Sequence, residues 1–168
     1  PLMTTTTEWQ SRWQRVMLGN YGTPPIAAVR GEGMYLEDAN GHRHLDMLAG
    51  IAVSTLGHGH PALIEAITRQ ATELLHTSNL AIHPTGVRLA ERLVSLTGWE
   101  SRVFFAQDGA TANEGALKIA RRYGYSFAHS KQRMVAMAGG FHGRTMGALA
   151  VTGNPAKRDP FEIGRAHV

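Results

Sequence analysis

Small residues and one carboxylate follow an apolar run near the middle of the chain. The stretch reads Phe-Phe-Ala-Gln-Asp-Gly-Ala-Thr-Ala-Asn-Glu over residues 104–114. If a helix begins here, the N–H groups of Gly109, Ala110 and Thr111 lack carbonyl partners within it and favour an anion such as phosphate or carboxylate. Asp108 offers another interpretation, because aspartate before a helix is a common N-cap. From this turn alone the cap is favoured, and the anion site is the alternative.

A second loop carries three side chains with binding chemistry. Phe141, His142 and Arg144 stand in the run Gly-Gly-Phe-His-Gly-Arg-Thr at residues 139–145. Arginine binds a carboxylate through two parallel hydrogen bonds, and a phenylalanine ring can cover a planar ligand. The alternative places Phe141 in a core and Arg144 in a surface ion pair, and this loop alone slightly favours it. Taken together, the two loops predict a site that binds a planar, phosphorylated ligand and carboxylate substrates.

The elements around the two loops indicate how the loops could meet. Residues 103–106 and 134–138 are short apolar runs that read as buried strands, and a helical pattern lies between them. Strand, helix and strand form a βαβ unit, so we expect parallel strands with a right-handed crossover. Ligands bind at the carboxyl ends of such strands, where both loops begin. The predicted inner face of the helix consists of Ala112, Ala116, Ile119, Ala120 and Tyr123.

The first half of the chain predicts a small β meander between helices. Residues 26–48 read as short strands with turns at 31–33 and 38–41. Ahead of them, residues 9–17 predict a short helix, and the polar run at residues 4–7 is expected to be disordered. Two further helices are predicted, one after Pro61 and one from Thr85 to Leu96.

Composition argues against several classes of protein. The 168 residues include no cysteine, so neither disulfides nor thiolate metal ligands are expected. The formal charge of +4 comes from scattered lysines and arginines, and we expect no nucleic-acid partner. No apolar run approaches the ~20 residues of a membrane span and no signal-peptide pattern is visible, which favours a cytoplasmic protein without a membrane partner. His58 and His60 are interpreted as part of a structural turn rather than a metal site.

Several stretches follow one another in an order that is typical of one known family. They are Asn-Tyr-Gly-Thr-Pro-Pro-Ile at 20–26, the glycines and aspartates of 31–46, Gly-Ile-Ala-Val and Leu-Gly-His-Gly-His-Pro within 50–61, His-Thr-Ser-Asn-Leu at 76–80, Gly-Ala-Thr-Ala-Asn-Glu at 109–114, Phe-His-Gly-Arg-Thr at 141–145 and Thr-Gly at 152–153. From residue 9 to residue 161 the chain resembles the N-terminal part of the class III, fold-type I pyridoxal-phosphate aminotransferases. Within that family it is most similar to the acetylornithine aminotransferases.

This resemblance implies a fold and a cofactor. The fold class is α/β, the N-terminal part of a fold-type I transferase: a small β-meander segment and the start of a mainly parallel sheet with flanking helices. The cofactor is pyridoxal 5′-phosphate, whose phosphate lies at residues 109–111. By the same resemblance Phe141 stacks on the pyridine ring, His142 joins the cofactor site, and Arg144 binds the α-carboxylate of the substrate.

The resemblance also implies an activity. The family transfers the terminal amino group of N-acetylornithine, or of a related ω-amino acid, to 2-oxoglutarate in arginine biosynthesis, as a homodimer. Ornithine, succinylornithine and 4-aminobutyrate aminotransferases are alternatives within the family, and a non-catalytic phosphate-binding module is the alternative outside it. No catalytic residue is assigned, because the family's Schiff-base lysine lies beyond this chain, and we expect the chain alone to be inactive.

The same pattern predicts three parts of the chain. Residues 1–56 are expected to form the N-terminal helix and a segment of a small domain. Residues 57–161 would be the first part of a large cofactor-binding domain. Residues 162–168 do not continue the family pattern and are expected to be a non-native tail.

Overall fold

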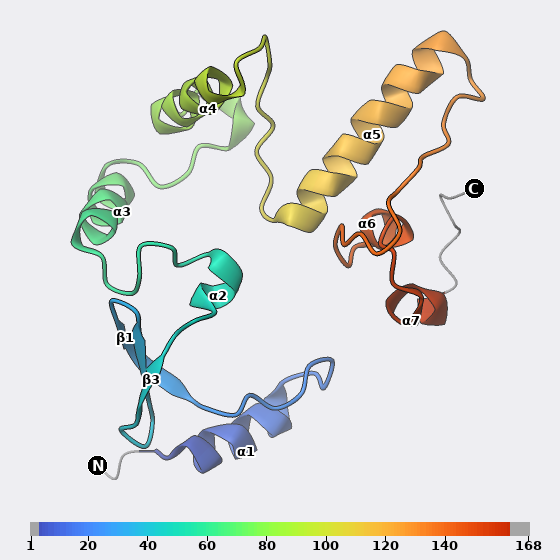
Figure 1. Ribbon diagram of the computed structural model, residues 1–168. Helices are drawn as coiled ribbons and strands as arrows, with labels where there is room; N and C mark the ends of the chain where they lie inside the picture. Colours follow the sequence, from blue (N-terminus) through green and yellow to red (C-terminus); the bar gives the residue numbers. More distant parts are fainter. Residues whose placement is uncertain (1–3, 162–168) are drawn as a thin grey trace. The chain divides into compact units, whose positions relative to one another are not determined.

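The computed structural model describes residues 4–161 (Figure 1). The predicted tail at 162–168 lies outside the described residues. Contacts divide the chain into two units, residues 1–82 and residues 83–168. The domain boundary predicted after residue 56 stays a prediction.

The first unit begins with α1 (Thr6–Val16), which starts earlier than the sequence pattern predicts. Thr5 is its N-cap, and the hydroxyl of Thr5 accepts a hydrogen bond from the Glu8 N–H at 3.3 Å. In return the Glu8 carboxylate accepts one from the Thr5 N–H at 2.7 Å. The predicted disorder of residues 4–7 is therefore wrong, because this reciprocal capping box satisfies the N–H groups at the start of the helix.

The predicted meander is confirmed as a three-stranded antiparallel sheet. Its strands are β1 (Ala28–Glu32), β2 (Tyr35–Asp38) and β3 (Arg43–Leu45), in the order β1-β2-β3. Gly33 turns the chain between the first two strands with a φ of +55°, a conformation in which glycine carries no steric penalty. The register places Glu32 opposite Tyr35 and Tyr35 opposite Leu45.

Asp38 organises the turn between β2 and β3. Its side chain is 3% exposed, and it accepts hydrogen bonds from the N–H groups of Asn40 and His42, both at 2.9 Å. His44 Nε2 lies 3.0 Å and His42 Nδ1 lies 3.3 Å from Asp38 Oδ2. The hydrogen bond with His44, followed by the backbone bonds, holds the pKa of Asp38 far below its usual range. The buried carboxylate is therefore an acceptor for every group around it.

Asp46 plays a similar part after β3. Its Oδ2 lies 2.8 Å from His58 Nε2, and its Oδ1 accepts hydrogen bonds from the N–H groups of Leu48 and Ala49 at 3.1 and 2.8 Å. The contact with His58 is the main reason that the pKa of Asp46 is lowered. His58 thus makes a structural contact, as its interpretation as a turn residue predicts.

A left-handed turn and two helices complete the first unit. The turn is α2 (Ala49–Ala52), in which Ala49, Ile51 and Ala52 have φ values of +48°, +62° and +60°. The predicted helix after Pro61 is confirmed as α3 (Pro61–Glu73), and a short 3-10 helix, η1, spans Ser78–Leu80.

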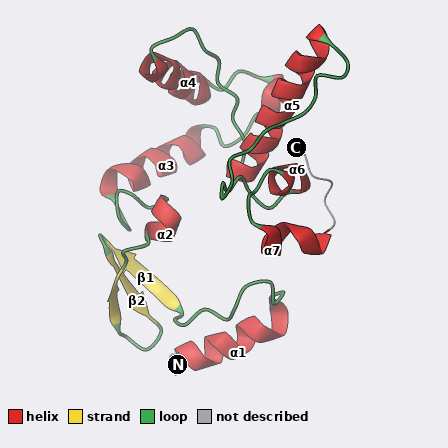
Figure 2. Cartoon of the chain, turned by 45° about the vertical axis from the view of Figure 1, so that its right-hand side comes forward, coloured by secondary structure: helices red, strands yellow, loops and turns green. Residues whose placement is uncertain are grey.

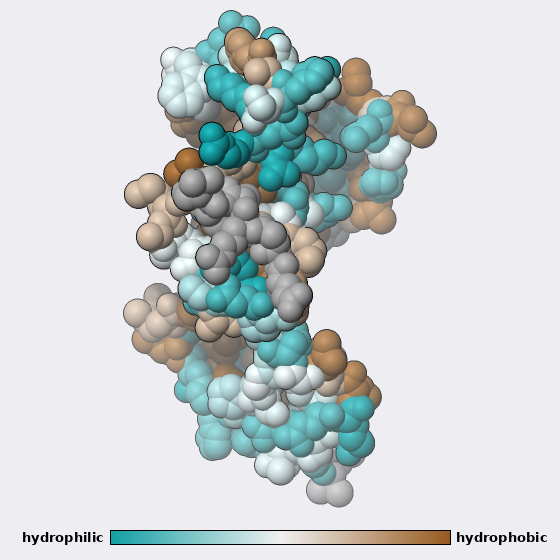
Figure 3. All heavy atoms as spheres, turned by 90° about the vertical axis from the view of Figure 1, so that its right-hand side faces the viewer, coloured by the Kyte–Doolittle hydropathy of each residue, from teal (hydrophilic) through white to brown (hydrophobic). Residues whose placement is uncertain are grey.

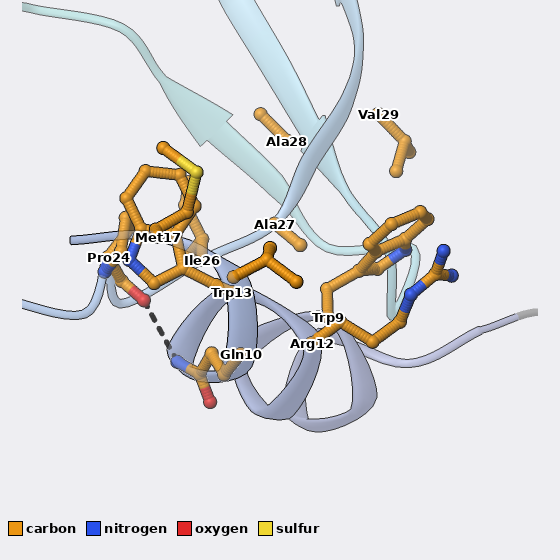
Figure 4. Close-up of a pocket in the computed structure, with 11 residues that line it drawn as sticks. Trp9, Gln10, Arg12, Trp13, Met17, Pro24, Ile26, Ala27, Ala28 and Val29 are labelled. Carbon is orange, nitrogen blue, oxygen red and sulfur yellow. Dashed lines mark hydrogen bonds between the residues drawn. The ribbon is translucent and has the colours of Figure 1, made fainter.

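The apolar side of α1 faces the segment that leads into β1 and leaves a groove of about 510 Å³ beside it (Figure 4). The Gln10 side-chain amide bridges the two by donating to the Pro24 carbonyl at 2.9 Å. The Arg12 guanidinium lies 4.2 Å from the centre of the Trp9 ring. The groove is mostly apolar, and its walls are Trp9, Gln10, Arg12, Trp13, Val16, Met17, Pro24, Ile26, Ala27, Ala28 and Val29.

The second unit is helical in its described residues (Figure 2). Its elements are α4 (Pro84–Thr97), α5 (Gly109–Phe127), α6 (Met146–Ala150), α7 (Pro155–Arg158) and the 3-10 helix η2 (Asp159–Phe161). The helix predicted from Thr85 to Leu96 and the helix predicted between the two apolar runs are both confirmed, as α4 and α5. None of the helices within residues 4–161 combines the length and the apolar character that crossing a membrane requires.

The two strands predicted in this unit are not formed within the described chain. Residues 103–106 and 134–138 belong to no strand and pair neither with each other nor with another described segment. The two strands that a crossover helix connects belong to one sheet, but they need not be adjacent in it. An extended segment without a neighbouring strand has no partner for its backbone hydrogen bonds, so it does not form a strand. The predicted inner face of α5 is accordingly uncovered, with Ile119 63% and Tyr123 68% exposed.

Apolar side chains reach the surface in both units, as the brown patches in Figure 3 show. Leu80 is 97% exposed in the first unit, and Val135 is 89% exposed in the second. The buried apolar residues of the described chain are Ala148, Leu149, Ala150 and Val151. The best-packed region therefore lies around α6, next to the loop that carries Phe141, His142 and Arg144.

Candidate functional site

Asp108 and Thr111 close the N-terminus of α5 with a capping box. The Asp108 carboxylate accepts a hydrogen bond from the Thr111 N–H at 2.9 Å, and the Thr111 hydroxyl accepts one from the Asp108 N–H at 3.2 Å. The Thr111 hydroxyl lies within 3.1 Å of the Asp108 carbonyl, to which it can donate. The N-cap interpretation of Asp108 is thus confirmed. The hydrogen bond from the Thr111 N–H is the main reason that the pKa of Asp108 is lowered.

The loop at residues 139–145 lies directly against this helix start. Gly143 has a φ of +128°, and a Cβ at this position would stand 2.5 Å from the Cβ of Ala110. Only glycine permits both this backbone conformation and this close approach. The structure therefore brings together the two loops that the sequence pattern singles out.

Two side chains hold the middle of the loop. The Asn113 side-chain amide on α5 donates to the His142 carbonyl at 2.7 Å. The His142 N–H donates to the hydroxyl of Thr152, a fully buried side chain, at 3.0 Å. The Thr152 hydroxyl in turn lies within hydrogen-bonding distance of the carbonyls of Ala148 and Gly143, at 3.0 and 3.2 Å. The backbone of His142 is thereby fixed from both sides.

Glu114 holds the end of the same loop. Its Oε1 accepts hydrogen bonds from the Thr145 hydroxyl at 2.7 Å and from the N–H groups of Gly147 and Ala148 at 2.8 and 3.1 Å. The hydrogen bond from Thr145 is the main reason that the pKa of Glu114 is lowered. A Cβ added at Gly147 would force the Glu114 carboxylate to move away from its hydrogen-bond donors.

The sequence pattern did not single out Asn113, Glu114 or Thr152 as residues that build the site. One signal could have indicated Asn113 and Glu114: they are adjacent polar residues that follow the predicted anion turn by two and three residues. Their partners lie 29 to 34 residues further along the chain, so no local pattern identifies those partners.

Phe141 and Arg144 extend from the loop into solvent. Phe141 is 65% exposed, so the alternative that places it in a core is not met in this structure. The Arg144 guanidinium carbon lies 5.9 Å from the centre of the Phe141 ring. Among residues 4–161 no carboxylate forms an ion pair with Arg144. An aromatic face and a cation are thus presented side by side, close to the start of α5.

The helix start fits a phosphate group, although the phosphate would have a charged neighbour. The first N–H groups of the 19-residue helix α5 belong to Gly109 and Ala110, and they have no carbonyl partner within the helix. Asp108 already accepts from the Thr111 N–H, and the Ala110 N–H adds a smaller contribution to the lowered pKa of Asp108. A phosphate would therefore share the first turn of α5 with the Asp108 carboxylate.

His142 also borders an apolar hollow of about 330 Å³ between α5 and residues 134–137. The hollow separates α5 from the segment at 134–137, which does not form the predicted strand. Its walls are Asn113, Ala116, Leu117, Ala120, Met134, Val135, Ala136, Met137, His142 and Val151.

Comparisons with known sequences agree on one family. The model of the aminotransferase class-III family matches residues 17–167. The acetylornithine aminotransferase of Mycolicibacterium smegmatis is 54% identical over 153 residues, which are 91% of this chain and 38% of that protein. The acetylornithine aminotransferase of Streptomyces coelicolor is 52% identical over 154 residues, 92% of this chain and 37% of that protein. The chain thus spans less than two fifths of the length of these relatives.

Solved structures give the same result for the fold. The ornithine aminotransferase of Toxoplasma gondii matches with a TM-score of 0.83 and 28% identity, over 95% of this chain and 38% of that one. An (S)-enantioselective omega-transaminase from Thermomicrobium roseum matches with a TM-score of 0.83 and 30% identity, over 94% of this chain and 38% of that one. The predicted fold class is confirmed by these matches, even though the parallel pairing is absent from the described residues.

Proposed function

The chain belongs to the class-III aminotransferase family, and from this premise we propose that it is part of an enzyme that transfers the terminal amino group of N-acetylornithine to 2-oxoglutarate. The activity belongs to arginine biosynthesis and uses pyridoxal 5′-phosphate. The amino donor is supported by the relatives named acetylornithine aminotransferase, which are about half identical over nine tenths of this chain.

The observation that supports this function best is the close approach of Gly143 to Ala110. It brings the N-terminus of α5, an aromatic face and an arginine into one small region. A ligand that is planar, phosphorylated and bonded to a carboxylate-bearing substrate needs these three features together.

Each residue has a distinct role in this proposal. The N–H groups of Gly109 and Ala110 bind the phosphate, and the Phe141 ring covers the planar ring of the cofactor. Arg144 binds the substrate carboxylate through two parallel hydrogen bonds. His142 joins the cofactor site from the loop that Asn113 and Thr152 hold. When bound, the cofactor supplies the electron sink for the reaction, while these residues bind and orient the reactants. From the family resemblance we infer that the lysine that would hold the cofactor covalently lies outside this chain.

We also propose that the complete protein is a cytoplasmic homodimer without nucleic-acid or membrane partners. The many exposed apolar side chains of the described residues support the need for additional protein surface. Sedimentation of the complete protein tests this assembly, and a monomer at all concentrations would contradict it.

The amino donor is tested by assaying the purified complete protein with 2-oxoglutarate and four donors: N-acetylornithine, ornithine, succinylornithine and 4-aminobutyrate. We expect the highest kcat/KM with N-acetylornithine. A preference for one of the other donors would assign the protein to another branch of the family. Cofactor binding without transfer from any donor would instead support a non-catalytic phosphate-binding protein.

A further inference from the structure

Glu114 on α5 binds the last residue of the second loop and the first turn of α6. Its Oε1 accepts from Thr145, Gly147 and Ala148, all of which follow Arg144 in the chain. We propose that Glu114 is a positioning residue that holds Arg144 where it can bind the substrate carboxylate. This inference rests on the proposed function, because it needs Arg144 to be the carboxylate-binding residue.

The geometry around Arg144 leaves few other ways to fix it. Its own side chain is exposed and forms no ion pair within residues 4–161. Its backbone lies between Gly143, which presses against Ala110, and Thr145, which donates its hydroxyl to Glu114. The position of the guanidinium relative to the helix start therefore depends on these two neighbours.

Glu114 is separate from the groups that would bind the phosphate. The capping box of Asp108 and Thr111 contains no contact with Glu114, and the Glu114 side chain begins more than one helical turn beyond Asp108. Loss of the Glu114 carboxylate should therefore release the loop at Thr145 and leave the N–H groups of Gly109 and Ala110 in place. Carboxylate affinity and cofactor affinity should then respond differently to the same substitution.

The closing experiment measures two dissociation constants in the complete protein. Calorimetric titration gives the affinity for pyridoxal 5′-phosphate and, in the cofactor-loaded protein, for glutarate, a dicarboxylate that carries no amino or oxo group. We expect Glu114→Ala to weaken glutarate binding by up to about a hundredfold, since at most the charged hydrogen bonds of Arg144 are lost. Cofactor affinity should stay within about twofold, because the residues that bind the phosphate are untouched.

A double-substitution cycle separates positioning from general damage. Arg144→Gln should weaken glutarate binding by about ten- to a hundredfold. Adding Glu114→Ala to Arg144→Gln should weaken it further by no more than about twofold, because Glu114 acts through Arg144. Additive losses would overturn the proposal, and so would equal losses of cofactor and glutarate affinity in Glu114→Ala.

Two more variants complete the design. Glu114→Gln keeps the shape and an acceptor oxygen but loses the charge, so we expect an intermediate loss of glutarate affinity. If Glu114→Ala does not fold, this variant decides the question, and unchanged glutarate affinity in it overturns the proposal. Glu91→Ala removes an exposed carboxylate of α4 and should change neither affinity. An unaltered protein that binds neither ligand would show that the proposed function itself is wrong.

Discussion

The two units of the chain differ in how their extended segments find partners. In residues 4–82, each strand pairs with the next one in the sequence across a short turn. In residues 83–161, the segments 103–106 and 134–138 are extended but belong to no strand. Antiparallel pairing closes locally, whereas parallel pairing needs neighbours that are distant in sequence. The described residues of the first unit therefore form a three-stranded sheet, and those of the second form no paired strand.

Apart from Glu8, which caps α1, the carboxylates that accept several hydrogen bonds also differ between the units in what they contact. In the first unit, Asp38 and Asp46 contact imidazole rings as well as backbone N–H groups. In the second unit, Asp108 and Glu114 contact N–H groups and hydroxyl groups at helix starts. The second unit thus fixes the loop at residues 139–145 with a few hydrogen bonds, although the predicted sheet is not formed among its described residues.

The largest expected effect comes from breaking the closest of those contacts. In the complete protein, Gly143→Val places a branched side chain at a φ of +128° and against Ala110. Backbone strain and overpacking together should destabilise the loop by roughly 2–5 kcal/mol. We expect cofactor affinity to fall by at least about a hundredfold, with loss of amide protection in residues 139–153. Cofactor titration and hydrogen exchange with mass spectrometry measure the two effects.

The comparison between the units provides the control for this variant. Amide protection of β1, β2 and β3 should stay unchanged, because their partners all lie in the first unit. Gly86→Ala in α4, where no atom lies within 4 Å of an added Cβ, should be neutral or stabilising by up to about 1 kcal/mol. Unaltered cofactor affinity in Gly143→Val would contradict the close approach.

The next effect concerns the first unit, where Asp38→Ala removes the shared acceptor of the β2–β3 turn. Two backbone N–H groups and two imidazole rings lose their partner. We expect the transition temperature of this unit to fall by more than about 5 °C. Protection of the β2–β3 pair should be lost first in hydrogen exchange. Glu37→Ala, at the exposed neighbouring position of the same strand, should change the transition temperature and this protection little.

The pH dependence of stability provides a second test of the role of Asp38. The pKa of Asp38 in the folded chain lies below the value of about 4 in unfolded chains. Near and below that value the unfolded state therefore binds more protons than the folded state. The stabilisation that the Asp38 carboxylate provides is fully present above about pH 4, and it is lost as the pH falls toward the lower pKa of the folded chain. The unaltered protein should lose stability in the first unit below about pH 4, and Asp38→Ala should show a flatter profile. Identical profiles would contradict the role of Asp38.

The sequence predicted the elements whose signals are local. Apolar residues at helical spacing identified α3, α4 and α5, and Gly33 and Gly41 marked the turns of the meander. Thr5 and Glu8 have the spacing of a capping box, but the polar composition of the threonine run at residues 4–7 predicts disorder instead. The meeting of the two loops followed correctly from their positions at the ends of apolar runs.

What the sequence did not predict depends on contacts between distant residues. Glu114 reaches Thr145 and Ala148 across more than 30 residues, and no periodicity indicates that a glutamate will cap a short helix so far away. Residues 103–106 and 134–138 likewise have the composition of strands but pair with no described segment. Periodicity predicts that a segment is extended, but it does not identify its neighbour.

A smaller effect is expected at the left-handed turn that follows Asp46. Ala52 is exposed and has a φ of +60°, which is unfavourable for a residue with a Cβ by roughly 1–2 kcal/mol. We expect Ala52→Gly to stabilise the first unit by up to about 1 kcal/mol, because glycine removes this strain but also loosens the unfolded chain. The same substitution inside α4, Ala90→Gly, should destabilise by about 1 kcal/mol. Urea unfolding of both variants measures the difference, and a destabilised Ala52→Gly would contradict the left-handed conformation.

The smallest expected effect concerns the charge that stands beside the proposed phosphate. Asparagine caps a helix about as well as aspartate, so Asp108→Asn removes the charge and preserves the bond to the Thr111 N–H. Because the carboxylate is exposed and screened, we expect the cofactor to bind only about two- to tenfold more tightly. Asp108→Ala also removes the charge but loses the cap, so it should lower the transition temperature as well. Higher salt should reduce the gain in Asp108→Asn, since screening weakens the repulsion that it removes. Weaker cofactor binding in Asp108→Asn would show that the carboxylate assists the site, and would place the phosphate away from the start of α5.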